Sequence, residues 1–296
     1  MVCHSFKLFV VLITALFSLP VQSSPVIFQK RGVCATEEPN PSLLRALQQV
    51  IIDETNPDPN VPEAREGPIE IDTWFHIISS RSEANQVTDA MINAQMHIGD
   101  ASIQYRLHGV TRHVNDHWAQ NGDDLAMKQA LRKGSYRTLN VFFQTDLQAT
   151  AGQAGRSQHR ANTISDDMSS SILGFCTLPD PSINATSPRE DYGGLWIYIT
   201  VGETAIHEIG HWNGLLHTFQ GESCSADNPG DYIADTPQQS TPTDGCPSRK
   251  DSCPDSPGLD AVHDFMDYSS DVCYEMFTNG QMQRMRNMWS TMRVGK

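Results

Sequence analysis

The alternation of apolar and polar positions predicts a mixture of strands and helices in the first half of the chain. Residues 69–79, 103–114 and 138–145 have the apolar, β-branched character of strands. Between them, residues 87–101 and 123–134 carry apolar residues at helical spacing. Strands that alternate with helices, followed by long irregular connections, indicate an α+β fold whose sheet backs a helix.

The rest of the chain is less regular. Residues 42–54 predict a short amphipathic helix, and residues 192–200 predict a buried strand. Residues 150–190 are rich in Gly, Ser, Asn and Asp, which favours a long loop. A final helix is expected to begin at Thr278 or Asn279. Methionines at helical spacing on it form a packing stripe: Met282, Met285, Met288 and Met292.

The N-terminal 66 residues differ from the rest. Residues 1–23 contain one lysine, a short apolar run and small residues at its end, which predicts a secretory signal peptide. Residues 24–66 are interpreted as a propeptide or N-terminal arm, because Lys30-Arg31 is a dibasic pair of the kind that kexin-like enzymes cut. Residues 55–68 form a proline-rich, acidic linker. The alternative is a surface wrap that stays on the mature protein.

Composition and charge narrow the class of protein. The formal net charge is −14 at pH 7 and the pI is about 5.1, which argues against nucleic acid and anionic membranes as partners. No later run approaches the ~20 apolar residues of a spanning helix, so we expect a soluble, secreted monomer. Of seven cysteines, Cys3 leaves with the signal peptide, and the remaining even number favours disulfides in an oxidising compartment.

The stretch HEIGHWNGLLH, from His207 to His217, carries the clearest chemistry. His207 and His211 are four residues apart, so on a helix they share one face and can bind one metal ion. Glu208 can reach a water on that ion, which is the position of a general base. Gly214 can adopt a positive φ, so the chain can turn and bring His217 round as a third ligand. Three protein ligands plus one water are typical of catalytic zinc.

This extended motif resembles the zinc signature of the metzincins, and a methionine turn should follow it. The stretch HDFMDYSSDVC, residues 263–273, supplies Met266, and HTFQG begins at the third ligand. Together with the cysteines between them, these features resemble the pappalysin branch, which contains ulilysin and many secreted fungal metalloproteases. The resemblance covers residues 69–296 and is strongest over 205–282.

The resemblance implies a metzincin-type catalytic domain over residues 67–296, with subdomains 67–217 and 218–296. Such a domain has a twisted mixed sheet, a zinc-binding helix and an irregular, disulfide-stapled C-terminal part that ends in a helix. The strand at 192–200 would be an edge on which an extended substrate pairs. The connection from Thr200 to Ala205 is shorter than is usual in members of this family.

The resemblance also implies roles for two residues of the methionine turn. Met266 would pack beneath the three histidines as an apolar floor. The phenol of Tyr268 could donate to the tetrahedral intermediate, and the alternative role for Tyr268 is packing alone.

The cysteines leave some pairings open. The four C-terminal cysteines allow three pairings, and the resemblance implies Cys224–Cys253 and Cys246–Cys273. Cys34 could block the zinc, by analogy with family members whose propeptide thiolate does so. Alternatively it forms a disulfide with Cys176, which the even number of cysteines favours.

Several other residues are candidates for structural or modification sites. Asn184 begins the sequon Asn-Ala-Thr, a plausible glycan site in a secreted protein. Asp231 and Asp235 could bind calcium, as in related enzymes, although a solvated acidic loop is the simpler interpretation. The remaining histidines of the first half lack ligand spacing and are expected to be structural or exposed: His76, His97, His108, His113, His117 and His159.

The sequence therefore predicts a secreted zinc endopeptidase that hydrolyses extracellular proteins or peptides. Zinc held by the three histidines would activate a water, and Glu208 would take its proton and pass it to the leaving amine. One alternative is a secreted zinc-binding interaction module without turnover, supported only by the short connection at 200–205. Another is a disulfide-stapled structural domain whose histidines are incidental, which predicts no stoichiometric zinc.

Overall fold

The structure is a computed structural model of the chain. It describes residues 33–34, 36–56, 67–95, 102–147, 172–188, 193–198, 204–225, 228 and 230–296. The expected signal peptide over residues 1–23, the dibasic pair Lys30-Arg31 and most of the short connection at 200–205 lie outside these residues. Those predictions therefore stay predictions.

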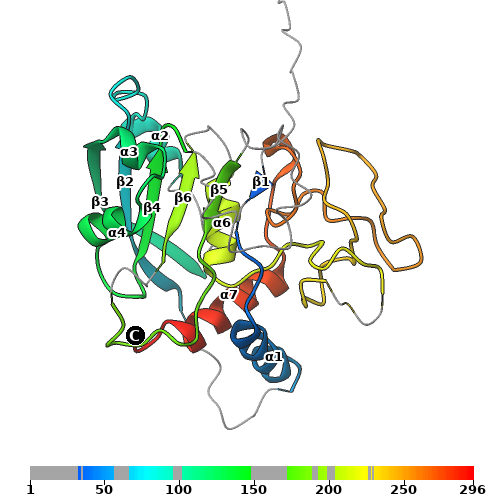
Figure 1. Cartoon of the computed structure of the whole chain (residues 1–296). Helices are drawn as coiled ribbons and strands as arrows, with labels where there is room; N and C mark the ends of the chain where they lie inside the picture. Colours follow the sequence, from blue (N-terminus) through cyan, green and yellow to red (C-terminus); the bar gives the residue numbers. More distant parts are fainter. Residues whose placement is uncertain are drawn as a thin grey trace, which may run out of the picture.

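A six-stranded mixed sheet forms one half of the molecule (Figure 1). Its strands run in the order β1-β5-β6-β4-β2-β3. Neighbouring strands are parallel except for β5 and β6, which are antiparallel. Their bounds are Val33–Cys34 for β1, Ile69–Ser79 for β2, Ile103–Val114 for β3, Leu139–Gln144 for β4, Ile172–Cys176 for β5 and Leu195–Tyr198 for β6.

Both faces of the sheet are covered, and β4 is accordingly buried along its whole length. Val141 and Phe143 belong to the main core with α6, whereas Phe142 packs with Met127 and Leu131 on the other face. The helices are α1 (Pro41–Thr55), α2 (Asp89–Gln95), α3 (Asp116–Ala119), α4 (Asp124–Leu131), α6 (Thr204–Trp212) and α7 (Asn279–Met292), with a 3-10 turn η2 (Asp271–Cys273). None of the helices within the described residues is long and apolar enough to cross a membrane.

The C-terminal helix α7 runs beneath α6 and the sheet, and α1 packs against it (Figure 1). Thr278 and Gln281 form a reciprocal capping box that fixes where α7 begins. At its other end, the buried guanidinium of Arg293 lies 3.5 Å from the ring centroid of Trp212 and donates to the carbonyl of Trp212 at 2.6 Å. Burial lowers the pKa of Arg293 to about 10, so the side chain remains a cation. Arg293 thereby connects the end of α7 to the end of α6.

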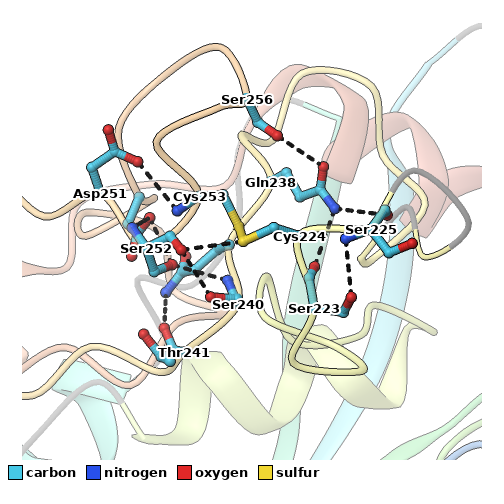
Figure 2. The surroundings of a disulfide bond; sticks show 12 residues. Ser223, Cys224, Ser225, Gln238, Ser240, Thr241, Asp251, Ser252, Cys253 and Ser256 are labelled. Carbon is cyan, nitrogen blue, oxygen red and sulfur yellow. Dashed lines mark hydrogen bonds between the residues drawn. A yellow bond between two sulfur atoms is a disulfide. The ribbon is translucent and has the colours of Figure 1, made fainter.

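Between α6 and α7 the chain is irregular, and two disulfides connect its loops. Cys224 pairs with Cys253 and Cys246 pairs with Cys273, which are the pairings that the resemblance implies. Beside the first disulfide, the side-chain amide of Gln238 donates to the backbone carbonyls of Ser223 and Ser225 (Figure 2). The same amide donates to the carbonyl of Asn228. Cross-links and side-chain amides here replace the regular backbone hydrogen bonds that these loops lack.

The pattern predicted the long strands well and the short ones poorly. The strands at 69–79 and 103–114 have the expected bounds, and the one at 138–145 is shorter by a residue at each end. Of the helix expected over 87–101, the structure describes α2, and residues 96–101 lie outside the described part. The expectation of a loop over 150–190 was wrong for residues 172–176, which form β5, whereas residues 177–188 are irregular as expected. The other residues of this range lie outside the described part.

A second correction concerns the edge of the sheet. The strand predicted at 192–200 is β6, which lies between β5 and β4 and is therefore not an edge. On the side of β6 away from β4 lies β5, and β1 from the N-terminal arm pairs with β5 as the outermost strand. Strands of two and five residues have too few alternating positions to be recognised from pattern alone.

Candidate active site

Helix α6 carries the first two histidines and is buried against the sheet. Its apolar side chains, among them Ile209 and Trp212, enter the main core, and α6 packs on β5 and β6. His207 and His211 are on the same side, with their ring centroids 4.7 Å apart. The four-residue spacing therefore gives the geometry that the sequence predicted.

Backbone carbonyls fix the orientation of both rings. Nδ1 of His207 is 2.6 Å from the carbonyl of Phe265, and Nδ1 of His211 is 2.9 Å from the carbonyl of Leu215. A carbonyl only accepts, so each Nδ1 donates, and in a neutral imidazole Nε2 is then the unprotonated nitrogen. Burial lowers the pKa of His211 to about 4, so this ring is neutral at physiological pH.

The third histidine reaches the site through a tight turn. The amide of Gly214 donates to the carbonyl of His211, and Gly214 has a φ of +94°, which side-chain-bearing residues rarely adopt. A Cβ at this position would also lie 2.6 Å from the side chain of Met288 on α7. After the turn, His217 stacks on Phe219 with ring centroids 4.9 Å apart. Phe219 was not predicted as part of the site.

The three imidazoles converge on one point. Nε2 of His211 lies 3.1 Å from Nε2 of His207 and 3.0 Å from Nε2 of His217. Two unprotonated nitrogens that face each other at this distance repel unless a cation lies between them. The donor set therefore fits a metal ion, and three imidazoles without a cysteine from the catalytic domain fit catalytic zinc.

Glu208 lies beside this cluster and is fully buried. Its Oε2 accepts a hydrogen bond of 2.8 Å from the hydroxyl of Thr36, a residue of the N-terminal arm. The same hydroxyl accepts from the amide of Cys176 on β5 at 2.9 Å. Thr36 therefore links the carboxylate to β5, and no local sequence pattern predicts this contact.

Cys34 also enters the site from the arm. One ligand atom from each of Cys34, His207, His211 and His217 lies within 4.8 Å of the others. Burial, and next the charge of Glu208, raise the pKa of the Cys34 thiol well above its usual value.

The proposed Cys34–Cys176 disulfide is not formed. Both cysteines are free and buried in the structure. The even number of cysteines favoured this pairing, but β1 aligns Cys34 with Gly174 rather than with Cys176. The sulfur of Cys34 lies with the histidines instead, which is the alternative that the sequence left open.

The methionine turn lies directly beneath α6. Met266 is fully buried, and an added Cβ on Gly210 would lie 2.4 Å from its Sδ. Because Gly210 sits between His207 and His211 on α6, the turn approaches the helix at the level of the two ligands. The turn is also connected to the third ligand, since the amide of Thr218 donates to the carbonyl of Met266 at 3.3 Å.

Two buried aspartates hold the methionine turn, and the sequence analysis missed both. Asp264 accepts from the amide of Met266 at 2.7 Å and from Gln281 of α7 at 3.0 Å. Asp267 accepts hydrogen bonds from the backbone amide of Tyr268 and from the side chain of Gln239. Burial raises the pKa of Asp264 to about 7. The sequence Asp-Phe-Met-Asp, with a carboxylate on each side of an apolar pair, is the feature that could have identified them.

Tyr268 lies against two of the three histidines, with its ring centroid 4.9 Å from that of His217 and 5.7 Å from that of His207. Its phenol donates to the backbone carbonyl of Cys34 at 3.3 Å. Tyr268 therefore contacts both the ligand rings and the arm.

The remaining candidates lie away from this cluster. Asp231 accepts from Thr236 and from the amide of Ile233, while Asp235 accepts from Thr278 and Gly280 at the start of α7. Both carboxylates thus have protein partners, and calcium binding stays a prediction. Asn184 lies on an exposed turn.

Comparison with known proteins places this geometry in a family. Residues 127–290 match the peptidase family M43, described as pregnancy-associated plasma protein-A. An extracellular metalloprotease of Aspergillus fumigatus is 55% identical, over 90% of this chain and 91% of that protein. The chain belongs to peptidase family M43. It is a zinc metalloendopeptidase, and the alternatives of a zinc-binding module or an incidental histidine cluster are set aside.

A second relative matches almost the whole chain. An extracellular metalloprotease of Aspergillus oryzae is 51% identical, over 97% of this chain and 98% of its own length. Among solved structures, mature mirolysin of Tannerella forsythia, in complex with a cleaved peptide, matches with a TM-score of 0.56 at 23% identity. That match covers 78% of this chain and 97% of mirolysin, and it shows that the two chains share a fold.

Proposed function

We propose that this M43 peptidase is secreted and hydrolyses peptide bonds of extracellular proteins, with Glu208 as the general base. The convergence of three Nε2 atoms beside a buried carboxylate carries this proposal. Secretion is supported by relatives that are named extracellular metalloproteases, and by the expected signal peptide. In that case Asn184, which is exposed, would be a glycan site.

The proposed mechanism assigns different roles to the three histidines and to Glu208. His207, His211 and His217 would hold zinc, which when bound polarises the peptide carbonyl and lowers the pKa of a water toward about 7. Glu208 takes a proton from the attacking water and passes it to the leaving amine.

Tyr268 is proposed to donate to the oxygen of the scissile carbonyl as negative charge develops there. Support comes from the arm, because the phenol already donates to a peptide carbonyl, that of Cys34, next to the ligand rings. A substrate carbonyl in the same place would receive the same hydrogen bond.

The N-terminal arm is proposed to hold the enzyme latent. Two contacts support this: Cys34 supplies a fourth ligand atom, and the hydroxyl of Thr36 donates to Glu208. The first would fill the position that water needs, and the second would reduce the basicity of the carboxylate. The uncut chain should therefore hydrolyse casein at a small fraction of the rate of the catalytic part released from the arm.

Substitution of Glu208 tests the catalytic assignment. Glu208→Gln should bind zinc stoichiometrically and unfold at a similar temperature, but lose at least about 100-fold in kcat, because a general base contributes 10²–10⁴-fold. The matched control is Glu275→Gln, which alters an exposed carboxylate and should retain full activity. A Glu208→Gln enzyme that cleaves casein at the parent rate would remove Glu208 from the mechanism.

A further inference from the structure

Helix α1 has an apolar stripe that is buried on the catalytic domain. Leu43, Leu47 and Val50 fall at helical spacing and are at most 3% exposed. They pack in one cluster with side chains from α7 and from the turn between the second and third ligands. Those side chains are Leu216, Met288 and Met292.

The same helix ends in a set of polar contacts with α7. Nη2 of Arg284 donates to Oε2 of Glu54 at 2.8 Å and Nε of Arg284 donates to Oε1 at 3.0 Å, while Asn287 also donates to Oε1 at 2.9 Å. Arg284 is buried, with 3% of its side chain exposed, and Glu54 is 20% exposed. An ion pair of two hydrogen bonds with its guanidinium withdrawn from water is directional, so it fixes the position of α1 along α7.

The two ends of this segment contact different parts of the enzyme. Cys34 and Thr36 lie beside β5 and in the active site, whereas α1 lies on α7 on the other side of α6 (Figure 1). The dibasic pair Lys30-Arg31 precedes this segment, and residues 57–68 of the proline-rich linker follow it. Neither cut breaks a contact between residues 33–56 and the catalytic domain.

We infer that the face of α7 formed by Arg284, Met288 and Met292 is a docking site for α1 that retains residues 33–56 as a bound peptide after the linker is cut. This inference rests on the proposed latency. Two linked contacts bind more tightly than either one alone, since the anchored helix keeps Cys34 and Thr36 at a high effective concentration beside the histidines. Hydrolysis of the linker is therefore not sufficient for activation, which requires that the peptide dissociate or be degraded.

Cutting the chain at a defined place tests this inference. Residues 57–66 are replaced by the recognition sequence of a site-specific protease, in the Glu208→Gln background so that the arm is not digested. After cutting, size-exclusion chromatography at micromolar concentration should yield one complex, and mass spectrometry should find the arm peptide in it. Separate elution of the arm immediately after cutting would overturn the inference. This readout does not need catalysis, so its failure is distinct from a failure of the proposed function.

Variants in α1 then identify the anchor. Leu47→Ala removes a buried side chain and should raise the dissociation constant of the arm at least about 30-fold, as large-to-small changes in a packed cluster do. The matched control is Ile52→Ala, because Ile52 is on the same helix but 53% exposed, and it should change the constant by less than about threefold. Alanine favours a helix, so a loss of affinity cannot come from a weaker α1.

Glu54→Gln provides a second variant that keeps the shape of the side chain. It should shorten the residence time of the arm, measured by dilution of the cut complex. In the parent enzyme with Glu208 intact, the same dilution should produce a lag before casein hydrolysis, and Leu47→Ala should shorten that lag. Equal effects of Leu47→Ala and Ile52→Ala, or full activity of the cut parent with the arm still bound, would contradict the inference.

Discussion

Gly210 lies where α6 crosses the methionine turn, and Gly210→Ala tests whether this contact sets the position of the zinc ligands. The new Cβ would lie 2.4 Å from Sδ of Met266 and 3.2 Å from the ring of Phe277. Met266 cannot retreat freely, because it is fully buried and its amide is bonded to Asp264. Either α6 or the turn must move.

Two opposing effects determine whether Gly210→Ala stabilises or destabilises the fold. Alanine has a better helix propensity than glycine by up to about 1 kcal/mol, which favours the variant. Overpacking of a close contact costs about 1–3 kcal/mol, and the distance here is far below ordinary van der Waals contact. We expect a net destabilisation of about 1–2 kcal/mol, which for a domain of this size lowers Tm by about 2–8 °C.

The assay is thermal unfolding of the chelator-treated protein, followed by titration with zinc. Because His207 and His211 flank Gly210, a displaced helix should also weaken zinc binding. The added methyl should cost less in a Met266→Ala background, where the sulfur is absent, so the two substitutions should not be additive. A Gly210→Ala protein with a raised Tm and unchanged zinc affinity would refute this reasoning.

Two further predictions concern pH and glycosylation. His76 is fully buried between Thr111 and Asn140, and burial lowers its pKa to about 4, so between pH 6.5 and 4 the unfolded chain binds a proton that the folded chain does not. Stability should fall over this range by up to about 3 kcal/mol, and urea unfolding of His76→Gln at pH 7 and 4.5 should show a smaller loss; an equal loss in both proteins would exclude His76 as the cause. Material secreted by a eukaryotic host should lose mass on endoglycosidase treatment, and Asn184→Gln should abolish that loss; an unchanged mass would contradict glycosylation at Asn184.

The parts of the site that follow from local spacing could be predicted from the sequence. A helix rise of 1.5 Å per residue puts His207 and His211 on one face, and a glycine at Gly214 permits the turn to His217. The long strands β2 and β3 were recognisable because many apolar positions contribute to their pattern.

The parts that depend on long-range pairing could not be predicted. β5 has five residues, and its neighbours β1 and β6 are distant in sequence, so no local period distinguishes it from the loops around it. Thr36 is 172 residues from Glu208, and nothing near either residue indicates their hydrogen bond. The even number of cysteines suggested a disulfide between Cys34 and Cys176, but a count contains no information about geometry. In the structure both thiols are free, and the sulfur of Cys34 lies beside the three histidines.

The contact of Arg293 with Trp212 has a consequence for biosynthesis. The residue that holds the carbonyl end of α6 is made about 80 residues later than that helix. A nascent chain that has not yet reached Arg293 cannot complete the packing around Trp212, the last residue of α6. Shortened versions that end before Arg293 should therefore accumulate without bound zinc.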